Sequence, residues 1–170
     1  MSDENIDKIT AEVAGTLAGL FRERVRRTPD LVAYRQHNEA DDRWEDYTWA
    51  DMAHEVARWQ LAFKRENLQP GERVAILLRN CREWVQFEQA ALGCGLVVVP
   101  LYTDDRPENI AYILNNAGAR LVFLQGSEHL DRLLEVHDQL GGLVRILTLE
   151  PAAVPHGEER VRTVKEWLPE

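Results

Sequence analysis

The strongest constraint on the fold is an alternation of strand-like and helix-like segments between residues 70 and 150. Short apolar runs lie at 73–78, 96–101, 119–124 and 143–149, and helical patterns lie between them at 82–92, 107–116 and 128–140. Runs such as LVVV lack polar alternation, which is typical of strands that are covered on both faces. Strands joined by crossover helices form parallel sheets. We therefore predict an α/β fold over residues 70–150, with a parallel sheet of four strands and flanking helices.

The preceding region is predicted to add an N-terminal helix, a β-hairpin and a core helix. A helical pattern at 16–27 is followed by two β-like runs on either side of HNEADDR, which predict a hairpin at 31–48. This hairpin cannot join the sheet as another parallel strand, so we expect it to pair elsewhere or along an edge. Thr48 and Asp51 have the spacing of a capping box. The apolar stripe of the helix that follows is Met52, Val56, Trp59 and Phe63.

The two ends of the chain are predicted to lie outside this α/β part, which spans residues 16–150. Residues 1–15 are acidic and polar and are predicted to form a tail. Residues 151–170 are predicted to be a linker that ends in a short helix. The apolar stripe of that helix is Val161, Val164 and Leu168.

The charge balance argues against nucleic acid as the expected partner, although one local basic patch remains possible at 21–27. The chain has 20 basic and 29 acidic residues and a formal net charge of −9, whereas phosphate contacts need a surplus of Lys and Arg on one face. The basic run at 21–27 is interpreted as the solvated face of a helix. The sequence has no pattern typical of a secretory signal and no apolar run long enough to span a membrane. We expect a cytoplasmic protein, with peripheral attachment to a membrane left open.

The cysteines and histidines do not have the spacing of a metal site. Cys81 and Cys94 lie in apolar surroundings and are predicted to be reduced, packed thiols. His129 and His137 are eight residues apart on the predicted helix 128–140, nearly on one face, and are interpreted as surface residues.

The glycines are interpreted as turn residues and helix caps, although GCGLVVVP at 93–100 resembles a nucleotide-binding turn. A dinucleotide fold places its glycines after a strand, where the next helix points its N–H groups at phosphate. Here Gly93 and Gly95 end a helix and precede a strand, as do Gly118 and the pair at 141–142.

The carboxyl ends of the predicted strands are where an open α/β sheet binds ligands. Asn80, Thr103 and Ser127 lie at these ends, and each has the residue type of an N-cap, with Asp104 and Asp105 as alternatives to Thr103. Capping therefore explains these residues without a ligand. No lysine follows a glycine-rich strand-to-helix turn, and the two serines form no GxSxG elbow. The residues alone give no complete active site.

Several pieces of the chain, in this order and spacing, resemble the N-terminal region of the adenylate-forming acyl-CoA synthetases of the AMP-binding superfamily. These pieces are TW at 48–49, GERVAILLRN at 71–80, GLVVVPLY at 95–102 and GARLVF at 118–123. The VPLY turn and the following ENIAYIL are most similar to the long-chain fatty acid branch. The similarity extends over residues 16–150.

The resemblance implies an enzyme that activates a carboxylate with ATP and Mg²⁺ to an acyl-adenylate and passes the acyl group to coenzyme A. Family members are several times longer than this chain. Their phosphate loop, their adenine-binding and magnesium-binding motifs and the lysine of their C-terminal domain lie beyond the matched region. No catalytic, cofactor-binding or metal-binding residue is therefore carried over, and ATP, Mg²⁺ and coenzyme A are implied only for a full-length parent.

Two hypotheses follow. In the first, the chain is the N-terminal segment of a long-chain fatty acid–CoA ligase and is inactive alone. Its partners are then the remainder of its own polypeptide and, through an exposed apolar surface, further copies of itself, and the parent's substrate is a fatty acid. In the second, the chain is a stand-alone, non-enzymatic α/β binding module that takes a ligand near Asn80, Thr103 and Ser127.

Overall fold

The core of the protein is a parallel sheet of five strands in the order β4-β3-β5-β6-β7. The structure is a computed structural model that describes residues 8–170. The strands are β3 (Arg73–Leu77), β4 (Val97–Pro100), β5 (Ala119–Leu124), β6 (Arg145–Thr148) and β7 (Val161–Thr163). The predicted α/β fold is confirmed, with one strand more than the sequence indicated.

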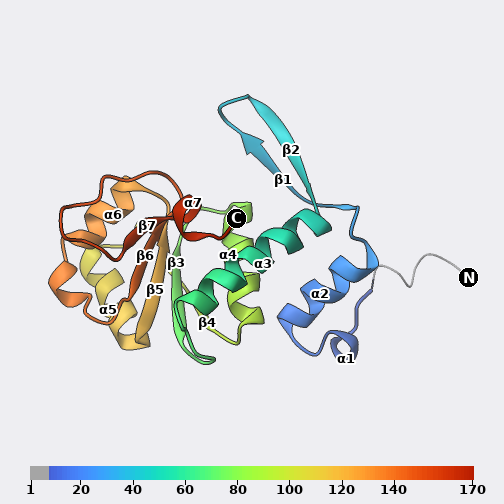
Figure 1. The fold of residues 1–170 in the computed structure, drawn as a ribbon, viewed down its shortest axis with the longest axis horizontal. Helices are drawn as coiled ribbons and strands as arrows, with labels where there is room; N and C mark the ends of the chain where they lie inside the picture. Colours follow the sequence, from blue (N-terminus) through green and yellow to red (C-terminus); the bar gives the residue numbers. More distant parts are fainter. Residues whose placement is uncertain (1–7) are drawn as a thin grey trace, which may run out of the picture.

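Helices cover both faces of the sheet, which explains why the central strands are continuously apolar. The helices α5 (Pro107–Ala117) and α6 (Ser127–Leu134) lie on one side, and α3 (Trp49–Arg65) and α4 (Arg82–Gly93) lie on the other (Figure 1). Successive residues of β5 alternate between the two cores: Val122 packs with the α5–α6 side and Phe123 with the α3–α4 side.

The α3–α4 side of the sheet has an aromatic core. Helix α3 begins at the predicted capping box, in which Thr48 and Asp51 exchange hydrogen bonds. The predicted stripe of α3 is buried, and its Trp59 ring lies 5.1 Å from Phe123 and 5.4 Å from Phe87, measured between ring centroids. Ring pairs at this separation add to the stabilisation that burial alone provides.

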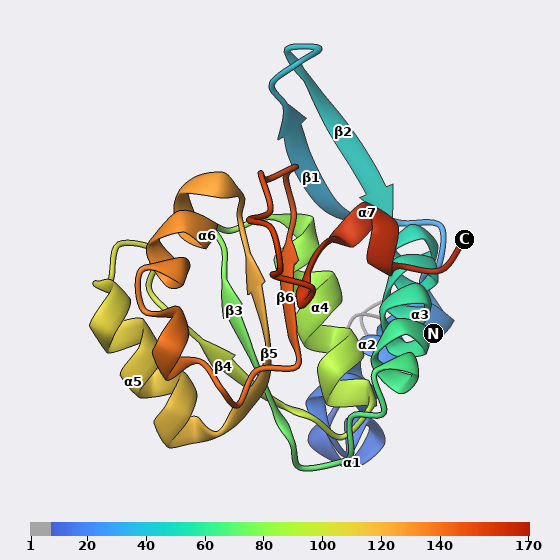
Figure 2. The same cartoon turned by 60° about the vertical axis from the view of Figure 1, so that its left-hand side comes forward.

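The hairpin forms a separate antiparallel sheet from β1 (Val32–Asn38) and β2 (Arg43–Thr48). It projects away from the body of the molecule (Figures 1 and 2). The prediction of a hairpin outside the parallel sheet is confirmed. The predicted N-terminal helix is α2 (Leu17–Arg27). Within the predicted polar tail, Ala11–Ala14 form the short helix α1, and residues 1–7 lie outside the described residues.

Two predicted helices differ from the structure. The helix expected at 128–140 ends at Leu134, and a 3₁₀ turn follows at His137–Gln139, so His129 and His137 do not share one helix face. The C-terminal stripe is divided as well, because Val161 belongs to β7 and only Val164–Trp167 form a helix, α7. Here pairing with β6 outweighs the helical spacing of the apolar residues.

The last residues of the chain are attached to α3 and β6 by partly buried polar contacts. The Glu66 carboxylate at the end of α3 accepts hydrogen bonds from Arg145 Nε and Trp167 Nε1, both at 2.6 Å. Arg58 Nε donates to the Pro169 carbonyl at 2.8 Å. These contacts place α7 between the sheet and α3, as Figure 2 shows.

Candidate functional site

The residues predicted at the strand ends line two adjoining cavities. Thr103 and Ser127 lie in a cleft of about 390 Å³ at the carboxyl ends of the strands. Asn80 lines a neighbouring cavity of about 900 Å³ between these ends and the hairpin. The two cavities share Arg79 and Glu150 as well as Gln125. The structure therefore brings two of the three residues together and separates the third.

The predicted capping role of Asn80, Thr103 and Ser127 is wrong. The residues at the N-cap positions are Cys81, Arg106 and Gly126, and none of them makes a side-chain capping bond. The alternative caps at the second strand end are also wrong, although the Asp105 carboxylate accepts from the Arg106 amide at 3.1 Å.

Two features of the structure explain why the predicted residues do not cap α5 and α4. Helix α5 begins at Pro107, whose fixed φ suits the first helical position and keeps the residue before it extended. The first amide of α4, that of Arg82, donates instead to the Gln36 side chain of the hairpin at 2.8 Å.

One of the two arginines of the strand-end cleft, Arg132, is bonded to the protein backbone. Arg132 donates to the carbonyl oxygen of Thr103 at 2.8 Å and also to that of Asp105. Gln125 donates to the Glu150 carboxylate at 2.6 Å. Burial lowers the pKa of His129, and the nearby Arg132 acts in the same direction. Three carboxylates and two arginines line the cleft, and one of these arginines, Arg132, is bonded to backbone carbonyls, so these residues fit poorly as a site for the phosphates of ATP.

The predictions for the two cysteines and for Gly95 and Gly118 agree with the structure. Cys81 and Cys94 are free and partly buried, and burial raises the pKa of Cys81 to about 11, so this thiol stays protonated at neutral pH. Gly95 and Gly118 have φ angles of 74° and 62°, which suits residues that follow a helix and precede a strand. Within residues 8–170, His, Cys, Asp and Glu form no group of three or more that fits a metal ion, and no helix is long and apolar enough to cross a membrane.

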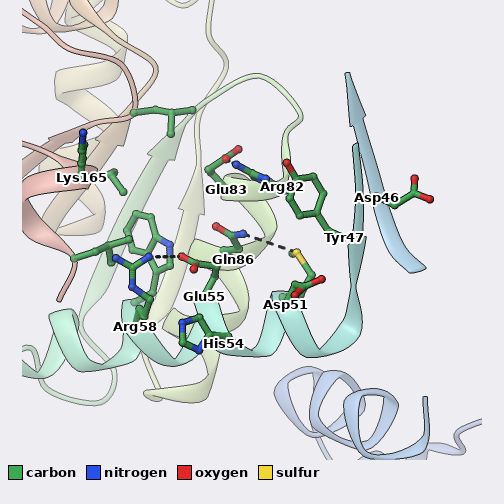
Figure 3. A pocket seen from close by; sticks show the side chains of 15 residues that line it. Asp46, Tyr47, Asp51, His54, Glu55, Arg58, Arg82, Glu83, Gln86 and Lys165 are labelled. Carbon is green, nitrogen blue, oxygen red and sulfur yellow. Dashed lines mark hydrogen bonds and ion pairs between the residues drawn. The ribbon is translucent and has the colours of Figure 1, made fainter. Parts of the chain in front are cut away.

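A third cavity was not anticipated from the sequence. This α3–α4 groove, of about 660 Å³, lies between β2, helices α3 and α4 and the C-terminal residues (Figure 3). Its apolar lining consists of Met52, Trp59, Leu149, Val164 and Leu168. Its polar lining consists of Asp46, Tyr47, Asp51, His54, Glu55, Arg58, Arg82, Glu83, Gln86 and Lys165. The residues come from segments more than a hundred positions apart, which is why no local pattern indicates the groove.

The arginines of the groove are paired within the protein. Arg58 donates to Glu55 at 2.8 Å, in the contact that is drawn in Figure 3. Arg82 donates to Glu83 at 2.6 Å, and its guanidinium carbon lies 4.0 Å from the centre of the Tyr47 ring. This stacking joins the hairpin to α4. Burial raises the pKa of Tyr47, and the hydrogen bond from its hydroxyl to Glu45 raises it further.

Two buried polar atoms that belong to the groove residues have no hydrogen-bond partner within the described chain. They are the indole N–H of Trp59 and the second carboxylate oxygen, Oε2, of Glu83. The amide of the buried Gln86 makes only a 3.8 Å contact with the sulfur of Met52. Both atoms are inaccessible to solvent, so they lie in the packed interior beneath the groove and not on its open surface.

Comparison with known proteins identifies relatives of most of the described region. The AMP-binding enzyme family matches residues 21–168. The long-chain-fatty-acid–CoA ligase FadD15 of Mycobacterium bovis is 27% identical over 133 residues, which cover 78% of this chain and 22% of the relative. Long chain acyl-CoA synthetase 2 of Arabidopsis thaliana is 32% identical over 108 residues, which cover 62% of this chain and 16% of the relative.

The fold is also similar to that of a solved acid ligase. The crystal structure of coronafacic acid ligase from Pectobacterium brasiliense superposes with a TM-score of 0.75 at 16% identity, covering 89% of this chain and 29% of that one. This likeness concerns the fold alone. The chain thus spans only a fraction, 22% and 16%, of the length of these two curated relatives. On the match over residues 21–168, the chain belongs to the AMP-binding enzyme family, that of the adenylate-forming acyl-CoA ligases.

Proposed function

We propose that this chain is the N-terminal segment of a long-chain fatty acid–CoA ligase. The full-length parent would activate a fatty acid with ATP and Mg²⁺ to acyl-AMP and then transfer the acyl group to coenzyme A. The observation that carries the proposal is the family match over residues 21–168, together with relatives that are named as long-chain ligases and are several times longer. Reading the native gene past the codon for Glu170 tests it. An open frame that continues into a serine-, threonine- and glycine-rich loop with a lysine is expected, and an immediate stop codon would contradict it.

We infer that the segment alone is inactive. Its strand-end cleft fits the phosphates of ATP poorly, because carboxylates such as Glu150 line it and Arg132 is bonded to the Thr103 carbonyl. The test is ATP–pyrophosphate exchange with the purified chain, a fatty acid and Mg²⁺, beside the full-length parent as the positive control. Exchange above background in the parent only is expected. Robust exchange by the 170-residue chain would overturn the inference.

The partners of the segment are then the rest of its own polypeptide and, when it is isolated, other copies of itself. Exposed large apolar side chains support this proposal: the exposed fractions are 85% for Tyr102, 68% for Trp44 and 66% for Leu17. Sedimentation at rising concentration tests it. Association of the isolated chain is expected, and a strictly monomeric chain that binds no hydrophobic dye would contradict it.

The location we propose is the cytoplasm, and peripheral attachment to membranes is the alternative to be tested. The support is compositional: the acidic balance of −9 and a sequence without the pattern of a secretory signal. Fractionation of cells that express the parent, followed by a high-salt wash of the membranes, separates the cases. Recovery in the soluble fraction or in the wash agrees with the proposal, and retention after the wash contradicts it.

A non-enzymatic binding module is the second candidate. It is favoured by one observation, the cleft that contains Thr103 and Ser127 beside the Asn80 cavity. A stop codon after Glu170 would make it the first choice, and ligand screening of the wild-type chain against an Asn80→Ala, Ser127→Ala double variant would then test the site.

A further inference from the structure

The ion pair between Arg145 and Glu66 fastens both ends of the segment that carries β7 and α7. The carboxylate of Glu66, at the end of α3, accepts hydrogen bonds from Arg145 Nε and from Trp167 Nε1 in α7, both at 2.6 Å. The same Arg145 donates to the carbonyl oxygen of Arg160 at 3.2 Å, just before β7 begins. Residues 160–169, which we call the strap, are therefore held at their start by the arginine and near their end by its carboxylate partner.

The strap has fewer buried residues than the centre of the sheet. Its buried apolar side chains are Val161 and Val164, whereas every residue of β5 except Arg120 is buried. Strand β7 is three residues long and lies at the margin of the sheet, where it pairs with β6 on one side. Segments with few buried contacts and an open backbone edge are those that open locally while the rest of a protein stays folded.

The residues before the strap are arranged as a loop that can change its path. Residues 151–158 form neither helix nor strand, and the Val154 side chain is 46% exposed. Exposed connecting segments of this kind are more mobile than the elements that they join. The loop therefore lets the strap move away from α3 without the unfolding of a helix or of a central strand.

The strap covers part of the aromatic core. The Trp167 ring lies 5.5 Å from that of Trp59 and 5.6 Å from that of Phe63, measured between ring centroids. The exposed fractions of Trp59 and Phe63 are 0% and 1%. Val164 and Leu168 of the strap also line the α3–α4 groove. Movement of the strap would therefore uncover aromatic rings and remove one wall of the groove.

We propose that the strap is a movable wall of the α3–α4 groove, which opens as one unit while the other four strands of the sheet stay paired, and that the Arg145–Glu66 ion pair is its fastener. The closed strap completes the groove, and the open strap leaves the groove wider and its aromatic floor accessible. This inference goes beyond the proposed function and does not depend on it, because every group that it needs lies within this chain.

Amide exchange of the 170-residue chain tests whether the strap opens as one unit. In the wild type, the Val161 and Leu168 amides, which are hydrogen-bonded near the two ends of the strap, are expected to exchange ~10-fold or more faster than those of β5. Trp167→Phe removes one hydrogen bond to a carboxylate and should accelerate both amides by the same factor, ~10-fold or more. Exchange of the wild-type strap at the β5 rate, or an effect of Trp167→Phe confined to Leu168, would overturn the proposal.

A pair of carboxylate variants tests the fastener. Glu66→Gln removes the charge that holds Arg145 and Trp167, so it should accelerate exchange at both ends of the strap by ~10-fold or more. Glu83→Gln is the matched control, because the Glu83 side chain is likewise 14% exposed and lies 2.6 Å from its own arginine, Arg82. The control contact persists when the strap opens, so this variant should leave exchange of the strap unchanged. Equal effects of the two variants on the strap, or an effect of Glu66→Gln at one end alone, would refute the fastener.

Discussion

The parallel sheet and the hairpin of this protein obtain their stability in different ways. Strands β3, β5 and β6 are almost wholly buried because helices cover both faces. The hairpin residues alternate between exposed and half-buried, and few contacts join it to the body. Its main links are the Gln36 bond to α4, the Arg82–Tyr47 stack and the ring contact of Tyr34 with Trp49 of α3.

This difference shows which part of the chain is self-sufficient. A two-stranded hairpin alone is marginally stable in water, whereas a sheet with two covered faces has a core of its own. The sheet should therefore determine global unfolding, and the hairpin should open locally without it. The following changes test that separation.

The largest effect is expected in the aromatic core. Phe123→Ala removes a fully buried ring that contacts Trp59 and Phe87, and the loss of packing should lower the free energy of unfolding by about 3–5 kcal/mol. Urea denaturation followed by circular dichroism measures it. A loss below about 1 kcal/mol would show that the sheet is not the source of global stability.

A smaller effect is expected at the junction of the two regions. Thr48 is the last residue of β2 and also the N-cap of α3, so Thr48→Ala removes the capping bond to the Asp51 amide. We expect a loss of about 1 kcal/mol and faster amide exchange in the first turn of α3. Thr48→Ser, which retains the hydroxyl, is the control and should stay close to wild type.

Acid should weaken the same junction through Asp51. The hydrogen bonds from Thr48 lower the pKa of Asp51 below its usual value. A carboxyl whose pKa is lower in the folded state adds stability that is present above its unfolded pKa, about 3.9, and is lost as the pH falls through the folded pKa. NMR titration of the α3 amides should show this loss only below about pH 4. An Asp51→Asn variant that keeps the same pH dependence would refute the assignment.

The smallest effect on stability is expected at the hairpin. The Trp44 side chain is 68% exposed and touches mainly the His37 ring, so Trp44→Ala should change the free energy of unfolding by less than about 0.5 kcal/mol. The same variant should reduce self-association of the isolated chain. A loss of global stability as large as that of Phe123→Ala would mean that the hairpin and the sheet unfold as one unit.

Local patterns were sufficient to predict most of the fold, because several elements depend on neighbouring residues. The capping box at Thr48 and the buried stripe through Trp59 are examples, and both occur as predicted. The strand β7 was missed because VRT is short and its pairing with β6 is a tertiary contact. The tie between Glu66 and Trp167 spans 101 positions and has no local signal.

The candidate site was less predictable than the fold for the same reason. Asn80 has the right residue type for a cap of α4, yet the first amide of that helix, that of Arg82, donates to the side chain of Gln36, 46 positions away in the sequence. Helix α5 begins at Pro107, so Arg106 occupies the N-cap position and none of the predicted caps does. The α3–α4 groove is lined by residues from segments far apart in the sequence, which only the folded arrangement brings together.

The strand order has a consequence for how the isolated chain behaves in a test tube. Strand β4 is at the margin of the sheet, so one side of its backbone is open to another strand, and Val97 there is 48% exposed. Exposed edge strands of this kind can pair with strands of other molecules and so promote amyloid-like aggregation. Here the strand is only four residues long and ends in Pro100, which has no N–H to offer. Pro100→Val should therefore shorten the lag before fibrils form, with the folded state otherwise unchanged.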